Sequence, residues 1–342
     1  MAKQKTPSKQ LAAILEDIPA VDAATASKVG EKLIAGGPDM ISELIGLVGQ
    51  EFGDPSGAMA KYALHATALY AGRPGKDEAR KAVAEALAGQ LAGRHSDEMK
   101  AFVIRQLQFC GRSEESGALA SFLGDKRLCE PATQALVSIG GDKSAAALRK
   151  ALGSAAGRSR VTLLNAVGRL KDAGSVPLAR KLAGDADRDV RLAALYALGN
   201  IGDAESSATL LAAARGKDSY ERTQALDACF LLARSGDVKI AAEICRAVST
   251  SRKDPSDVRD RCAALAVLAE TCGAEAVADV AKAMDSKNAK LRHPAARTAV
   301  KLALAIGARH SAKSKELLKK ALKSTKDDSV VRDAEALLAV LD

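Results

Sequence analysis

The chain has 342 residues, of which 47% are hydrophobic but only 3% aromatic, and it contains no Trp. This length exceeds the usual single globular domain of about 100–150 residues, so a single ordinary hydrophobic core is excluded. The formal net charge is +9, but residues 282–328 alone hold 13 basic and 4 acidic residues, so the chain has no basic stripe along its whole length.

The N-terminal region differs from the rest of the chain. Residues 1–38 are predicted to form a basic tail followed by a helical cap, with short helices over 9–17 and 22–35. Gly36-Gly37-Pro38 then breaks the helical pattern. Residues 39–342 are predicted to form a repeat array with a Lys-rich C-terminal end.

The repeats are recognised by a helix of small apolar residues that recurs along the chain. Its clearest copy is DADRDVRLAALYALGNIGD, residues 185–203: a polar turn, an amphipathic helix and a Gly-Asp stop. Related helices begin near residues 59, 98, 131, 160, 190, 222, 258, 291 and 331. Shorter amphipathic segments precede several of them, at 144–152, 176–182, 206–214, 241–248 and 276–284. The sequence therefore predicts an all-α fold, a right-handed α-solenoid of about nine helix-turn-helix repeats.

The pattern at Asp187, Val190-Arg191, Ala193-Ala194, Ala197-Leu198 and Ile201-Gly202 resembles HEAT repeats. In detail it is similar to the short HEAT-like repeats of the bilin-lyase type. The resemblance covers residues 40–342 and implies a scaffold that binds proteins, peptides or, less often, nucleic acids. It also implies that a ladder of Asp and Arg residues helps the repeats to pack.

One arginine recurs at the same phase in successive repeats. Stacked along an array, these arginines could form an anion-binding ladder, but acids precede several of them near the helix N-termini, where acids satisfy free backbone donors. We therefore interpret the series as a structural ladder. Its members are Arg160, Arg191, Arg222, Arg259 and Arg332.

Two regions depart from the repeat pattern and are the candidate binding sites. The first gathers Tyr and His residues in a chain that is poor in them, and the second is the basic C-terminal end, where lysines recur at i, i+4 and i+8 on one helix face. The alternatives are core packing against the cap for the first and a solvated outer face for the second. The first comprises Tyr62, His65, Tyr70, Arg73 and Arg105, and the second comprises Arg292, Lys315, Lys319 and Lys323.

No catalytic constellation is visible. The four histidines form no HExxH motif, and no GxSxG or strand-linked GxGxxG motif occurs. The segment 153–159 is one residue short of a phosphate loop and has Arg158 in place of Lys, so it predicts a turn between helices. The sequence predicts no catalytic residue, no cofactor and no metal site.

The compartment and the function follow as predictions. Glu16 and Asp17 interrupt any signal-peptide core, no run of about 18 apolar residues occurs, and the six cysteines fit buried thiols, so we expect a cytoplasmic protein without a transmembrane segment. The preferred hypothesis is a non-enzymatic scaffold for a protein or peptide partner. One alternative is anion or nucleic-acid binding by the basic end, although no aromatic residue follows Phe230 to stack on bases. Bilin-lyase-like activity is implied only by the repeat subtype.

Overall fold

The computed structural model describes residues 6–20, 22–48, 55–250 and 257–341, and the predicted tail lies partly outside them, at residues 1–5. The described residues are helical apart from turns and loops, and they contain no strand. The chain divides into two compact units, residues 1–172 and 173–342. The all-α solenoid fold is confirmed, because neighbouring helices pack in pairs along each unit. The number of nine repeats and the right-handed twist stay predictions.

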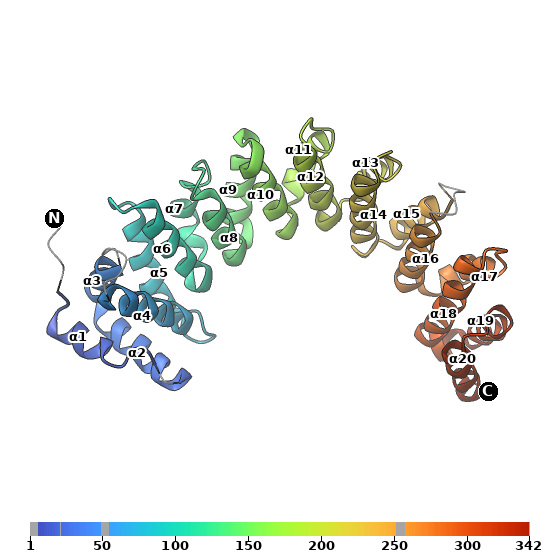
Figure 1. Cartoon of the computed structure of the whole chain (residues 1–342), viewed down its shortest axis with the longest axis horizontal. Helices are drawn as coiled ribbons and strands as arrows, with labels where there is room; N and C mark the ends of the chain where they lie inside the picture. The colour runs from blue at the N-terminus through green and yellow to red at the C-terminus, as the bar shows by residue number, and fades with distance from the viewer. Residues whose placement is uncertain (1–5, 21, 49–54, 251–256, 342) are drawn as a thin grey trace. The chain divides into compact units, whose positions relative to one another are not determined.

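The first unit contains two layers of helices (Figure 1). In one layer, each of the second helices packs against the next, and the first helices form the other layer beside them. The layer of second helices comprises α2 (Ala23–Ala35), α4 (Pro55–Ala71), α6 (Asp97–Cys110), α8 (Cys129–Ile139) and α10 (Gly157–Arg169). The other elements are α1 (Lys9–Leu15), α3 (Gly37–Val48), α5 (Asp77–Leu91), α7 (Ser116–Ala120) and α9 (Gly141–Ser154).

The second unit repeats this arrangement. Its second helices are α12 (Arg188–Ile201), α14 (Ser219–Ala233), α16 (Val258–Cys272), α18 (Ala289–Ile306) and α20 (Asp328–Leu341). Its first helices are α11 (Val176–Leu182), α13 (Ser207–Ala213), α15 (Val238–Thr250), α17 (Val277–Met284) and α19 (Ser311–Ser324). The helix starts predicted from the sequence agree with these bounds to within a few residues.

Helix α12 shows why this sequence folds locally as it does. The Asp187 side chain accepts a hydrogen bond from the backbone N–H of Asp189, which satisfies one of the free donors at the helix start. Gly202 ends the helix in the left-handed region, with φ of 83°, where residues with a Cβ are disfavoured. Val190, Ala194 and Leu198 recur at four-residue spacing and are all buried. The polar turn, the apolar face and the glycine stop therefore define the bounds of α12 from its own sequence.

Close approach between α12 and α14 depends on a glycine. A Cβ built on Gly199 would lie 2.6 Å from the carbonyl oxygen of Ala228 and 3.0 Å from its Cα, both backbone atoms of α14. Buried Ala193, Ala194 and Ala197 on the same helix extend this small-residue surface. Small residues in place of large aromatic ones therefore allow α12 and α14 to pack at short distance.

Candidate functional site

The arginine of the clearest repeat bridges its own loop to the next repeat. The Arg191 Nη1 donates to the carbonyl oxygens of Asp185 and Ala186, at 2.8 and 2.9 Å. Its Nη2 and Nε donate to the Glu221 carboxylate of α14, at 2.6 and 3.3 Å. The bonds to Glu221 raise the pKa of Arg191 above its ordinary value. The guanidinium thus fixes the turn before α12 and links two consecutive second helices.

The same contact with loop carbonyls recurs in other repeats. The Arg160 Nε donates to the Ala155 carbonyl at 2.7 Å, and the Arg292 Nη1 donates to the Ser286 carbonyl at 2.9 Å. In each case the acceptor lies five or six residues before the arginine. Arg292, a candidate binding residue, thus makes the same type of contact as the ladder arginines.

The other three arginines of the predicted ladder, Arg222, Arg259 and Arg332, differ from Arg160 and Arg191 in their surroundings. The Arg222 Nε is buried and has no hydrogen-bond partner among the described residues. Arg259 and Arg332 are exposed.

A second arginine series, on the first helices, was missed from the sequence. The Arg149 Nε and Nη2 donate to the Asp172 carboxylate at 2.8 and 2.6 Å, and Asp172 is buried. Each member of the series reaches forward to the end of the following second helix, to the loop after it, or to the start of the next first helix. These contacts run from Arg80 to the carbonyls of Cys110 and Gly111, from Arg149 to Asp172, from Arg180 to Asp203 and Glu205, and from Arg246 to Asp279. The acceptors lie 23 to 33 residues away in sequence, and two of them are backbone carbonyls. The series therefore has no sequence motif of fixed spacing by which it could be predicted.

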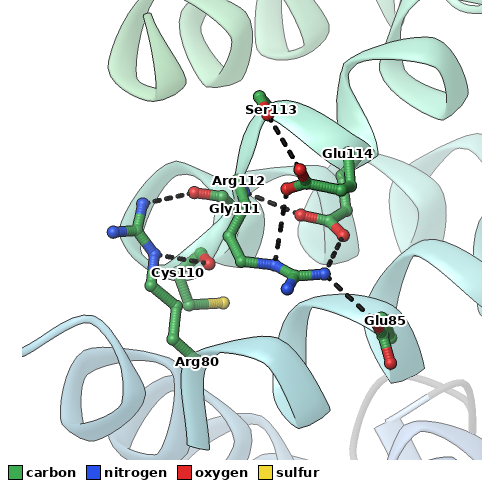
Figure 2. Close-up of polar contacts among 8 residues, drawn as sticks. Arg80, Glu85, Cys110, Gly111, Arg112, Ser113 and Glu114 are labelled. Atoms are coloured by element: carbon green, nitrogen blue, oxygen red, sulfur yellow. Dashed lines mark hydrogen bonds and ion pairs between the residues drawn. The ribbon is translucent and has the colours of Figure 1, made fainter. Parts of the chain in front are cut away.

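The corner between α6 and α7 holds an ion pair whose carboxylate is buried (Figure 2). The Arg112 Nη2 donates to Glu115 at 2.9 Å and to Glu85 at 3.1 Å, while the Arg112 backbone N–H donates to the other Glu115 oxygen at 2.7 Å. The Glu115 side chain is only 3% exposed, whereas that of Glu114, 3.9 Å from the same guanidinium, is 58% exposed. The hydrogen bond to Glu115 raises the pKa of Arg112. These contacts hold the loop between α6 and α7 against α5.

The thiols are placed for packing. Five of the six cysteines are buried and Cys262 is half-buried. Burial raises the pKa of Cys110, Cys229 and Cys245 to about 12, so these thiols stay protonated at neutral pH and are poor nucleophiles. In the part of the chain that the structure describes, no group of three or more His, Cys, Asp and Glu side chains could hold a metal ion.

An exposed apolar surface covers α4 and α6. Tyr62 and Leu69 of α4 are 46% and 42% exposed, and Phe109 of α6 is 42% exposed. His65 lies between them, with its ring edge-on to Phe109 at 5.2 Å between centroids and its Nδ1 3.0 Å from the Gln106 Oε1. We name Tyr62, His65, Leu69, Arg105 and Phe109 the aromatic face. Arg105 is exposed and forms no hydrogen bond or ion pair with another described residue.

Tyr70 and Arg73 do not belong to this face. The Tyr70 ring is buried, and its hydroxyl donates to Glu31 of α2 at 2.8 Å. The Arg73 Nη1 donates to Ser27 Oγ of α2 at 2.8 Å. The Lys76 Nζ lies 4.7 Å from the Tyr70 ring centroid, and its hydrogen-bonding interaction with the Tyr70 side chain raises the pKa of Lys76. The proposed cluster is therefore divided: Tyr62, His65 and Arg105 face solvent, while Tyr70 and Arg73 tie α4 to α2. Tyr70 lies on a different face of α4 from His65, because five residues separate them and a helix turns about 140° beyond one full turn over that distance.

The basic C-terminal end is partly neutralised. Lys320 of α19 pairs with Asp285 at 2.6 Å, and Arg297 of α18 pairs with Asp327 at 2.8 Å. Hydrogen bonds from Ser329 and Arg297 lower the pKa of Asp327 to about 2, so it stays ionised. Lys319 and Lys323 are exposed and Lys315 is half-buried.

The turn predicted at residues 153–159 is confirmed, because α9 ends at Ser154 and α10 begins at Gly157. A cavity of about 890 Å³ lies beside this turn, between α7, α8 and α9. Another, of about 670 Å³, lies between α16 and α18 and is lined by Cys262, His293 and Lys301 among others. None of the helices in the described ranges is long and apolar enough to cross a membrane.

Comparison with known proteins places part of the chain in a family. A family model described as HEAT repeats matches residues 147–229, which include α10 and α12 and most of α14. No curated protein matches.

Two solved structures align over 98% of the chain. One is a crystal structure of an engineered protein, with 21% identity, a TM-score of 0.43 and 99% of that protein covered. The other is the crystal structure of Kap121p, with 12% identity, a TM-score of 0.47 and 46% of that protein covered, so the chain spans about half its length. The HEAT-repeat resemblance drawn from residues 187–202 is confirmed, because these residues lie within the segment that the HEAT-repeat model matches. The bilin-lyase subtype stays a prediction.

Proposed function

We propose that this protein is a non-enzymatic scaffold that binds a protein partner through the aromatic face on α4 and α6. HEAT repeats commonly serve as protein-interaction scaffolds, and the proposal depends on one observation, the exposure of Tyr62, Leu69 and Phe109 on two adjacent second helices. Aromatic residues and arginine dominate the energetic centres of protein interfaces because they bury a large area with few rotatable bonds. Tyr62, Leu69 and Phe109 are exposed together on adjacent helices, and grouped exposed apolar side chains mark interaction surfaces more often than single ones do.

Removing the aromatic face is expected to abolish partner binding without unfolding the protein. The double variant Tyr62→Ala/Phe109→Ala changes exposed side chains, and truncation of a central interface aromatic costs about 2 kcal/mol or more, which is roughly 30-fold in Kd. Capture from a lysate of the native host, with mass spectrometry, identifies proteins bound by the wild type and lost by the variant. The Kd of the purified pair is then measured.

The control is Tyr220→Ala, which truncates an equally exposed aromatic on α14 in the other unit. It should retain the partner. If the Tyr62/Phe109 variant recovers the same proteins with the same Kd as the wild type, the aromatic face is not the binding surface.

A second candidate function is anion or nucleic-acid binding by α19. The observation that favours it is the exposure of Lys319 and Lys323 on one face of that helix, beside Lys315. Duplex DNA should bind more weakly as salt rises from about 50 to about 200 mM, because phosphate contacts release counterions. Lys319→Gln/Lys323→Gln should weaken binding and flatten the salt slope, whereas the control Lys217→Gln/Lys239→Gln should not. Failure to bind DNA or RNA at about 50 mM salt would remove this candidate.

Bilin-lyase-like activity is implied only by the repeat subtype. Incubation with bilin and an apo-phycobiliprotein tests it, and absence of covalently bound pigment would remove it. No cluster of the described residues argues for this activity, so the scaffold is the function that the geometry supports best.

A further inference from the structure

The cavity beside α9 arises from unequal helix lengths. Helix α7 has 5 residues and α9 has 14, so at about 1.5 Å per residue α9 is about 13 Å longer than the first helix before it. Helix α7 can therefore flank only part of α9, and the loop between α7 and α8 flanks the remainder. The resulting groove has a volume of about 890 Å³ and is lined by residues from α7 to the start of α10. We call it the α9 groove.

The floor of the α9 groove is apolar. It includes Leu123 and Cys129, which are buried, and Ala147 and Ala151, which are half-buried on successive turns of α9. Small side chains on α9 leave the space open, because a larger residue at either alanine would project into it. Such a floor receives an apolar side chain of a ligand, which loses its contact with water there.

The rim of the α9 groove is basic. Lys126, Lys150 and Arg158 line it, all three are exposed, and none forms a hydrogen bond or ion pair with another described residue. Glu130 is the single acidic residue among those that line it.

The neighbouring basic residues are paired. Arg127, next to Lys126, lies 3.5 Å from Asp97, and Arg149, next to Lys150, lies 2.6 Å from Asp172. In each of these two adjacent pairs, the arginine forms an ion pair within the chain, whereas the lysine lines the groove. Three unneutralised cations around an apolar floor are complementary to carboxylates that flank an apolar side chain.

We propose that the α9 groove binds an acidic segment of a partner polypeptide, with its carboxylates against Lys126, Lys150 and Arg158 and an apolar side chain on the floor. The groove is built from α7 to α10, whereas the aromatic face is built from α4 and α6, so this site goes beyond the proposed function and does not depend on it. The charge of the rim selects the class of partner, and the alanine floor selects the size of its central side chain.

Selection from a library of random short peptides displayed on phage tests this proposal. Peptides enriched on the full-length protein should combine Asp or Glu with Leu, Ile or Phe. The most enriched peptide, labelled with fluorescein, should lose at least about tenfold in affinity for Lys126→Glu/Lys150→Glu/Arg158→Glu, because three attractive exposed pairs become repulsive. It should also bind more weakly to Ala151→Leu, which fills the floor without changing charge.

The matched control carries the same change in net charge at exposed basic residues of the same unit outside the groove: Lys28→Glu/Lys81→Glu/Arg94→Glu. It should bind the peptide within about twofold of the wild type. An equal loss in both triple variants, enrichment of peptides without acidic residues, no enrichment, or stronger competition by an oligonucleotide than by the unlabelled peptide would each overturn the proposal. If Tyr62→Ala/Phe109→Ala removes peptide binding instead, the acidic ligand occupies the aromatic face, and the proposed function stands while the groove proposal fails.

Discussion

Replacing Gly199 with alanine is expected to lower the free energy of unfolding by about 3 kcal/mol, as overpacking of a tight contact does. The new Cβ would lie 2.6 Å from the carbonyl oxygen of Ala228, closer than real Cβ atoms approach a backbone atom. The clash is with backbone, so no side-chain rotation relieves it, and α12 must move away from α14. Chemical denaturation followed by far-ultraviolet circular dichroism measures the loss.

Gly89→Ala is the matched control for Gly199→Ala. Gly89 lies within α5, and a Cβ there would meet nothing within 4 Å. The same substitution should therefore raise stability by about 0.5–1 kcal/mol, because alanine favours the helix. If Gly199→Ala is neutral, or both variants shift stability in the same direction, close packing of α12 on α14 does not depend on this glycine.

Arg112→Met is expected to destabilise the first unit by about 3 kcal/mol at neutral pH. Methionine preserves most of the apolar stem but removes the guanidinium, which leaves the buried Glu115 carboxylate without its ion-pair partner. The control Glu114→Gln removes an exposed carboxylate 3.9 Å from the same guanidinium, and it should cost less than about 1 kcal/mol. Equal effects of the two substitutions would show that burial does not govern this cluster.

The helices could be predicted from the sequence because each carries its own signals. The turn, the apolar face and the stop glycine all lie within one stretch of about 19 residues at 185–203, so nothing distant is needed to define α12. The same local signals identified the turn before α10. Boundaries shifted by a few residues where helices extend beyond the apolar pattern, as α15 does at Val238–Thr250.

The site could be predicted less well, because it depends on contacts between repeats. Arg80 and Arg149 are ordinary exposed-helix residues in the sequence, and only the stacking of first helices brings Arg149 to Asp172. Tyr70 is close to His65 in the sequence, but it is buried against α2, and closeness in sequence does not separate the two positions. The α9 groove could not be predicted at all, since it depends on the short length of α7 relative to α9, and weak short helices are the least certain elements of a sequence-based assignment.

The packing of each helix pair on its immediate neighbours has a consequence for how such a chain evolves. A duplicated segment of about 30–40 residues brings its own turn, apolar face and arginine, and it finds on both sides the surfaces that the original pair already used. The forward-reaching arginines on the first helices travel with that segment, since each needs only an acid or a carbonyl in the repeat that follows. An array of this kind can lengthen by copying one unit, and packing constrains the exposed residues of each copy least.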